Sequence, residues 1–361
     1  MRFSKYLLYN LFVLTILTAS LSASTDLTID LIDDIEFVNK EMTESSFEQF
    51  PTLFFSENDE VIPTAFAMVN TLGYPMGKST ICLFPHFEFG IAAGGGLLEY
   101  SRKDDYTDEK PSVPFGGVNC GFHWGTGITD RLDITFKLFF FSLEWVSSID
   151  QTFQGEGVTT SYEIKLDESD VTSLGVKGRY RLIRDRLYIP MVYTFGGITL
   201  NLSIDYMKGE VGTTFSLSDT QSVDLNYQTM PISANISSNI CGEGTIDWNI
   251  LTITPEIFAY IDLFHVFSLY TGPSVSFNFG SFDFNIDATG DFIVLIDPIS
   301  GDIGNVTLRS RNHMTPRLII PKWTVGFEID LLLAKLQIEG ATLLTSVTDS
   351  FTAQVGIRFQ L

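Results

Sequence analysis

The chain has 361 residues and carries 44 acidic against 22 basic side chains, a net charge of −22 at neutral pH. This charge argues against a nucleic-acid-binding protein, because phosphates require a basic surface. Three cysteines are an odd number that fits no disulfide framework. Hydrophobic residues make up 45% of the chain, with 31 Phe and 29 Gly. After residue 23, no segment is apolar over the roughly 18 residues that a membrane helix needs. The apolar residues are therefore expected in short strands.

The N-terminus has the layout of a secretory signal peptide. Arg2 and Lys5 precede an apolar run from Leu7 to Ala19, and small residues follow it. The run is too short for a membrane-spanning helix, which needs about 20 residues. We therefore predict that residues 1–23 are a signal peptide that is removed after export.

The next part of the chain, residues 24–79, differs from the rest. Between residues 25 and 62, apolar side chains such as Leu27 and Leu31 recur at roughly helical spacing among many acidic ones. This spacing predicts an acidic amphipathic helix, and the Gly- and Pro-containing residues 63–79 are predicted to be an ordered lead-in. The helix either plugs a barrel or lies in the periplasm, and a loosely held extension is the alternative.

From residue 80 to the end, apolar and polar residues alternate, as in strands with one apolar face. The last strand is the clearest case: Phe351, Val355 and Phe359 share one face and Arg358 lies on the other. Ten strands are predicted, at residues 81–100, 116–124, 132–140, 171–183, 187–205, 244–260, 265–279, 316–329, 335–345 and 351–361.

The connections between these strands alternate in length, apart from the short final one at 346–350. Alternation of short periplasmic turns and long outer loops is the rule in bacterial barrels. Strand-like pieces at 159–166 and 292–296 are either extensions or extra strands that raise the number to 12 or 14. A parity switch after Gly196 and Gly197 predicts a β-bulge. The expected fold for residues 80–361 is all-β, an antiparallel transmembrane β-barrel of about ten strands. Short turns are predicted at 125–130, 184–186, 261–264 and 330–334.

The final strand, residues 351–361, resembles the C-terminal assembly signal of bacterial outer-membrane proteins, with Leu361 in place of the usual aromatic residue. Residues 124–140 (WGTGITDRLDITFKLFF) are similar to a short periplasmic turn of such barrels. The resemblance implies an outer-membrane location and, as partners, outer-membrane lipid and the barrel-assembly machinery. A segment before the barrel also resembles fatty-acid transporters, although the chain lacks the Asn-Pro-Ala signature expected in their hatch.

No catalytic, cofactor or metal site is predicted, and the protein is not expected to be an enzyme. The four histidines occur singly, without metal-ligand spacing. The Gly-rich residues 90–96 do not match a phosphate-binding loop and indicate close packing or room beside a plug. Aromatic residues with outward parity are predicted to form interface girdles: Trp124, Tyr180, Trp248 and Trp323.

Charged residues on the polar face are predicted to line the lumen, because a charge on the lipid face costs about 2–4 kcal/mol near the bilayer centre. They either form a salt-bridge network that fills a narrow barrel or line a channel or ligand lumen. The triple Lys177, Arg179 and Arg181 would attract anionic solutes. The predicted set is Glu88, Asp133, Lys137, Lys177, Arg179, Arg181, Lys322, Glu328, Lys335, Glu339 and Arg358.

Three functions remain open at this point. The first is a pore or transporter for small solutes. The second is a closed, non-conducting surface barrel whose acidic loops bind external partners. The third is a soluble secreted β-protein.

Overall fold

A computed structural model describes the chain in thirteen pieces. The predicted signal peptide and most of the predicted acidic helix lie outside them. No helix within them is long and apolar enough to cross a membrane. The described residues are 24–31, 61–74, 77, 86–101, 112–143, 147–155, 158–189, 192–227, 230–264, 266–296, 299–331, 334–344 and 350–360.

Among the described residues, one helix and fourteen strands form the fold, and ten of the strands form a ring. The helix α3 covers Val61–Asn70. Four strands lie outside the ring: β1 (Ser24–Leu31), β5 (Ser147–Gly155), β7 (Arg186–Ile189) and β11 (Ile299–Met314). The ring strands are β2 (Phe87–Ser101), β3 (Ser112–Gly127), β4 (Leu132–Leu143), β6 (Val158–Ile183), β8 (Tyr193–Tyr227), β9 (Met230–Leu263), β10 (Phe267–Ile296), β12 (Ile319–Leu331), β13 (Ala334–Leu343) and β14 (Ser350–Gln360).

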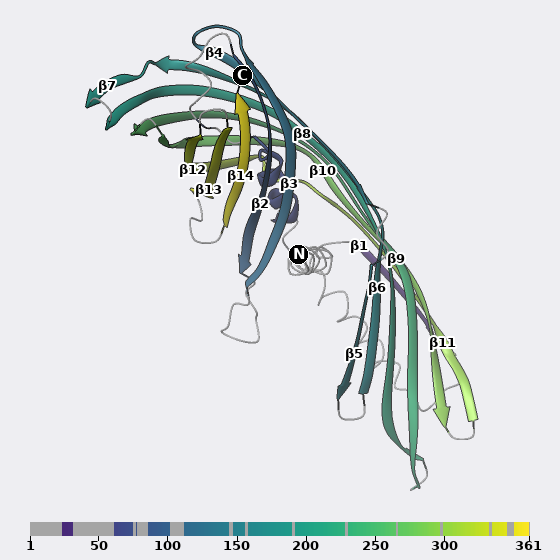
Figure 1. The fold of residues 1–361 in the computed structure, drawn as a ribbon. Helices are drawn as coiled ribbons and strands as arrows, with labels where there is room; N and C mark the ends of the chain where they lie inside the picture. The colour runs from purple at the N-terminus through teal and green to yellow at the C-terminus, as the bar shows by residue number, and fades with distance from the viewer. Residues whose placement is uncertain are drawn as a thin grey trace.

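The ring closes because the last strand pairs with the first. Each ring strand is antiparallel to the next, and β14 returns to β2 from Ser350↔Leu98 to Gln360↔Glu88 (Figure 1). Closure leaves the ring without a terminal edge strand. The predicted antiparallel barrel of about ten strands is confirmed.

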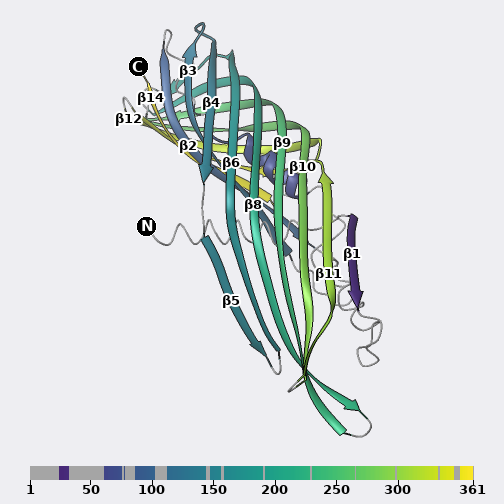
Figure 2. The same ribbon diagram turned by 90° about the vertical axis from the view of Figure 1, so that its right-hand side faces the viewer.

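Four ring strands are much longer than the others. β6, β8, β9 and β10 have 26, 35, 34 and 30 residues, against 11 in β14. Their far halves run beyond the ring and form a curved sheet with β1, β5 and β11 (Figure 2). We call this sheet the extension. The pieces at 159–166 and 292–296 are therefore extensions of β6 and β10, not extra ring strands.

The two faces of the ring differ in chemistry. Along β14, Thr352 and Arg358 are buried while Phe351, Val355 and Phe359 are exposed. A polar inner face and an apolar outer face define a transmembrane β-barrel of the outer-membrane type. We call the apolar outer surface the lipid belt.

The extension lies beyond the lipid belt. On β8 the outward apolar side chains run from Leu200 to Tyr206, and on β9 they run from Ile261 to Leu251. The next outward residues are polar, beginning with Lys208 and Asn249, which face each other across the two strands. The strands thus leave the hydrocarbon region at this row.

Two further sequence-based predictions are wrong, and one is confirmed. Residues 24–31 form β1 along β11, so the helix predicted there is wrong: Leu27, Ile29 and Leu31 also alternate, and the free edge of β11 offers backbone pairing. Trp248 is buried in the lumen rather than in an outer girdle, because both faces of β9 carry apolar residues. The predicted bulge is confirmed by a register shift at Gly197, where φ is 93°.

Candidate functional site

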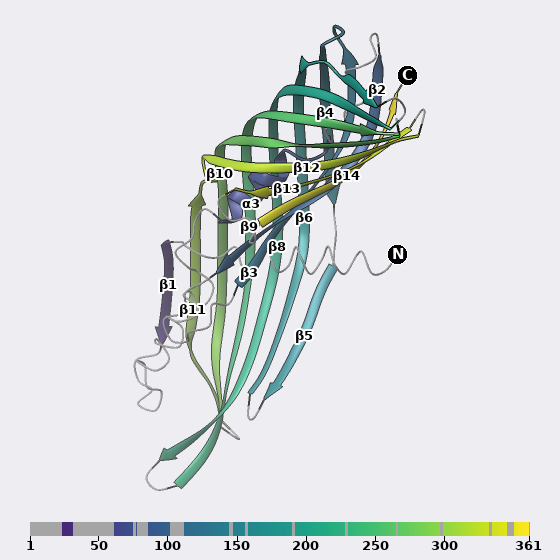
Figure 3. The same cartoon turned by 90° about the vertical axis from the view of Figure 1, so that its left-hand side faces the viewer.

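Most of α3 lies in the predicted lead-in, residues 63–79, and the helix is enclosed by the ring (Figure 3). Its Phe66 ring lies 4.9 Å from Trp248 and 5.2 Å from Phe282, centroid to centroid. Met68 and Val69 are buried in the same cluster. Apolar side chains of β8, β9 and β10 at the long-strand end of the lumen therefore form a seat for the helix.

Glycines of β2 and β3 make room for the other side of α3. A Cβ atom at Gly117 would lie 2.9 Å from Val69 Cγ2, and one at Gly96 would lie 3.0 Å from Val69 Cγ1. A Cβ atom at Gly94 would lie 3.0 Å from Leu72 Cδ1. We call residues 61–74, which fill this part of the lumen, the plug. The Gly-rich stretch packs closely against it, as its sequence indicated.

The C-terminal end of α3 rests on a buried lysine. Lys137 Nζ donates to the carbonyl oxygens of Asn70, at 2.6 Å, and Leu72, at 2.8 Å. It also lies 3.0 Å from Asp205 Oδ1. The last carbonyls of a helix have no partner within the helix, and a cation there is favourable. Lys137 therefore joins the helix to the barrel wall.

Two asparagines add to this attachment. Asn70 Nδ2 donates to Asp205 O and to Thr252 Oγ1, both at 3.1 Å. Asn119 Nδ2, on β3, donates to Val69 O at 3.0 Å. Each bond links the backbone or an end of α3 to a different wall strand.

Tyr74 continues the attachment after the helix. Its hydroxyl donates to Asp205 Oδ1. The ammonium groups of Lys137 and Lys177 lie 4.8 and 4.7 Å from the centre of its ring. A cation within about 6 Å of a ring face is attracted to it.

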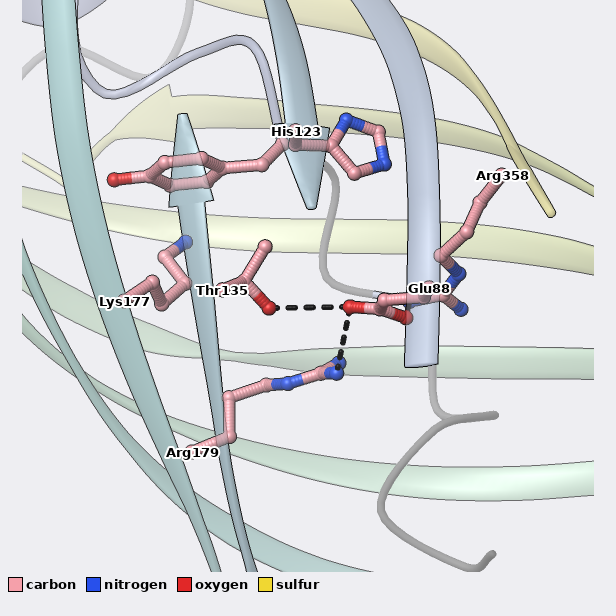
Figure 4. Close-up of a pocket in the computed structure, with 7 residues that line it drawn as sticks. Glu88, His123, Thr135, Lys177, Arg179 and Arg358 are labelled. Atoms are coloured by element: carbon pink, nitrogen blue, oxygen red, sulfur yellow. Dashed lines mark hydrogen bonds and ion pairs between the residues drawn. The ribbon is translucent and has the colours of Figure 1, made fainter. Parts of the chain in front are cut away.

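A charged cluster lies next to Tyr74, and Figure 4 shows its members Glu88, Arg179 and Arg358. Arg179 holds Asp133 through two bonds, Nε to Oδ1 at 2.9 Å and Nη2 to Oδ2 at 2.6 Å, and donates to Gly77 O at 2.7 Å. Glu88 accepts from Thr135 at 3.1 Å and lies 3.1 Å from Arg358 Nη1. The cavity among these side chains has a volume of about 10 Å³, close to the minimum for one water molecule.

The remaining predicted lumen charges also have partners. Lys177 lies 3.4 Å from Glu256, Arg358 2.7 Å from Glu328, Arg181 3.6 Å from Asp185, and Lys335 2.7 Å from Asp330. Lys322 donates to Thr71 Oγ1 at 3.2 Å, and Glu339 accepts from Tyr270 and Gln354. In the described structure the lumen is filled by paired charges and by residues 61–74.

Sequence reasoning missed the plug contacts of Asp205, Asn119 and Tyr74. The contacts of Asp205 and Asn119 could have been anticipated from the sequence, because the alternation of their strands places both side chains on the inner face. Tyr74 lies outside the strand pattern and gave no such signal. The described residues contain no group of three or more His, Cys, Asp or Glu that would hold a metal ion.

The fold and the plugged lumen define a transmembrane β-barrel of the outer-membrane type. Residues 110–361 match the model of the Lsa36-like family, and the chain belongs to this family. No curated protein matches the chain.

Three solved outer-membrane barrels are similar to this chain at 10–11% identity. The outer-membrane protease OmpT of Escherichia coli has 11% identity and a TM-score of 0.34, covering 79% of this chain and 100% of its own. The transport unit of the E. coli autotransporter AIDA-I has 10% identity and a TM-score of 0.27, with 83% and 99% covered. The toluene transporter TbuX of Ralstonia pickettii has 10% identity and a TM-score of 0.21, with 84% and 98% covered.

Proposed function

We propose that the protein is an outer-membrane barrel that passes small solutes when α3 leaves its seat, and that the described structure is its closed state. The observation that carries this proposal is that the ring closes without α3. Displacing the helix breaks side-chain contacts and a few hydrogen bonds, whereas the strand pairing stays intact.

The proposal includes export and insertion in the way that the sequence predicts. The N-terminal signal peptide would direct the chain out of the cytoplasm, and the final strand would engage the barrel-assembly machinery. Outward Phe351, Val355 and Phe359 would then face outer-membrane lipid. The short turns would face the periplasm, and the extension would lie outside the cell.

The lumen offers two environments to a solute. The seat of α3 is apolar and contains Trp248, Phe282 and Phe284. The charged cluster below it carries Arg179 and Arg358, which already hold carboxylates. The charged cluster is already held together by ion pairs, so the main change on opening would be departure of α3 from its seat. The vacated seat would form an apolar chamber next to a charged constriction.

Conductance in planar bilayers tests the proposal. The wild-type barrel is expected to be closed for most of the recording. Lys137→Met removes the support of the helix end and should increase the time spent open. Lys208→Met, on the exposed outer face beyond the lipid belt, is the matched control and should behave as wild type. A silent Lys137→Met variant that is correctly folded would overturn the proposal.

A second candidate function is binding of an external partner by the extension. Its outer face carries a row of acidic residues in register, Glu210, Asp247 and Asp283, next to His313 on β11. Such a row favours a cationic partner. Binding of polylysine to the purified barrel, compared with a variant carrying Glu210→Gln, Asp247→Asn and Asp283→Asn, tests it. Equal binding by both proteins would remove this candidate.

A further inference from the structure

The barrel wall is not paired along its whole height between β3 and β4. Pairing runs from Gly127↔Asp133 to Phe122↔Leu138. Within the described residues it stops there, although β3 extends back to Ser112 and β4 continues to Leu143. On their other sides, β3 stays paired with β2 to Ser112 and β4 with β6 to Leu143. The separation is therefore confined to one seam.

The β3 edge of the separation lies within the lipid belt, and its β4 edge lies at the border of the belt. Phe140 pairs with Thr172 on β6, which pairs with Lys208, in the row where the long strands leave the hydrocarbon region. On β14 the outward apolar residues run from Phe359 to Phe351, and Phe351 is level with Leu97 on β2 and Gly116 on β3. The unpaired part of β3, from Gly116 to Gly121, thus borders the same layer. Unpaired strand edges are costly in hydrocarbon, and membrane proteins tolerate them only where they border a cavity or are covered by protein. Because unpaired edges lower the stability of the barrel, a seam that nevertheless has them is a candidate for a functional role.

Exposed aromatic side chains flank the separation. Phe140 on β4 is 66% exposed and Phe122 on β3 is 64% exposed. The other large apolar side chains that are exposed on the described outer surface have lower values, from 36 to 59%. On the opposite face of the unpaired end of β4, the face that carries Lys137, Phe139 and Phe141 stack at 6.0 Å. The border of the separation is apolar, which suits a molecule dissolved in the membrane.

The plug lies directly behind the separation on the lumen side. A Cβ atom at Gly121 would lie 2.9 Å from Gly73 O and 3.0 Å from Lys137 Cγ. Asn119 Nδ2 reaches both Val69 O, at 3.0 Å, and Ser173 Oγ on β6, at 3.4 Å. The same contacts that hold α3 therefore also close the inner side of the seam.

We propose that the seam between β3 and β4 is a lateral opening, through which an apolar solute dissolved in the membrane passes between the lipid and the lumen when α3 is displaced. The proposal rests on the function proposed above and names its substrate class. A polar solute would use the axial route through the barrel, whereas an apolar one need not leave the membrane.

A disulfide staple across the seam tests the proposal. Two residues beyond the last pair, Cys120 and Phe140 lie on the outer face of the two strands, so Phe140→Cys can bond to the native Cys120 when the edges approach. The staple is made in a chain with Lys137→Met, Cys82→Ser and Cys241→Ser. Flux of the apolar dye N-phenyl-1-naphthylamine into proteoliposomes and potassium chloride conductance are both measured.

The matched control is a staple where the strands already pair. Trp124 and Phe136 face each other across β3 and β4. Trp124→Cys with Phe136→Cys, in the same chain with Cys120→Ser, should change neither readout. The seam staple is expected to lower dye flux to that of protein-free vesicles, to leave conductance unchanged, and to be reversed by dithiothreitol.

A chemical block covers the case in which the staple does not form. Pyrene maleimide attached to Cys120 would fill the seam and lower dye flux, whereas the same adduct on Val355→Cys in a Cys120→Ser chain would not. Unchanged dye flux after the block or a formed staple, with conductance present, would overturn the lateral opening alone. Absence of both flux and conductance in every Lys137→Met chain would instead overturn the proposed function.

Discussion

The Lys137 ammonium group lies 3.0 Å from the Asp205 carboxylate inside the lumen, and both side chains are fully buried. Lys137 also binds the carbonyl oxygen of the last α3 residue, Asn70, and that of Leu72 just beyond it, and Asp205 accepts from Tyr74. This ion pair therefore attaches residues 70–74, which follow the helix, to two wall strands, β4 through Lys137 and β8 through Asp205. The plug depends on a small number of such contacts.

Replacing Lys137 with methionine should destabilise the barrel. The change leaves a buried carboxylate and two carbonyls without their cation, and breaking a buried ion pair costs about 3–5 kcal/mol. The free energy of unfolding in guanidinium, measured in detergent micelles, checks this. Lys208→Met is the control, because this side chain is exposed. Equal losses in the two variants would contradict the assigned role of Lys137.

The bidentate contact of Arg179 with Asp133 should not tolerate lysine. Arg179→Lys keeps the charge but loses the fork and the bond to Gly77 O. We expect a loss of about 1.5–3 kcal/mol, as for one charge-assisted hydrogen bond. The temperature at which the folded band disappears in a heat-modifiability gel measures it. Arg184→Lys is the control, since its pair with Asp130 is exposed, and it should leave that temperature unchanged.

A charge introduced on the lipid belt should oppose membrane insertion. Val355 is half exposed at the middle of β14, and Val355→Arg should cost about 2–4 kcal/mol at that depth. The fraction of protein folded into vesicles, read from its resistance to protease, measures this. Thr289→Arg, outward on the extension, should fold like wild type. Normal folding of Val355→Arg would argue against the position of the belt.

The acidic row on the extension predicts a dependence of stability on pH. Partial burial and the neighbouring Asp283 carboxylate raise the pKa of Asp247. The folded protein thus holds this proton more tightly than the unfolded chain. The associated stabilisation is present at acid pH and is lost as the pH rises through the raised pKa.

Asp247→Asn removes this dependence and should raise the unfolding temperature at pH 7 but not in acid. Asp291→Asn is the control, because its cross-strand neighbours are Asn239 and Asn305. A shift of the same size at both pH values, or in both variants, would contradict the pH dependence assigned to Asp247.

The ring was predictable because its strands follow a period of two. The alternating pattern of the last strand predicts both the strand and its buried face, with Phe351, Val355 and Phe359 on one side and Thr352 and Arg358 on the other. The same rule located the inward charges, although it gave no information on their partners, which come from other strands.

The plug was not predictable in the same way. The helix at residues 61–70 is short and has apolar residues on most of its faces. It is stabilised by its seat in the lumen rather than by an amphipathic pattern. Trp248 was misplaced because its strand has apolar residues on both faces. Where tertiary packing replaces periodicity, the sequence pattern no longer defines the structure.

Disulfide trapping inside the lumen tests the central claim, that α3 lies within the barrel against β3. Because a Cβ atom at Gly117 would lie 2.9 Å from Val69 Cγ2, Val69→Cys and Gly117→Cys should crosslink under mild oxidation in a chain without native cysteines. The control pairs Val69→Cys with Gly178→Cys, a position with no neighbour within 4 Å. The account predicts a crosslink in the first pair and none in the control. Free thiols in both pairs of the folded barrel would contradict it.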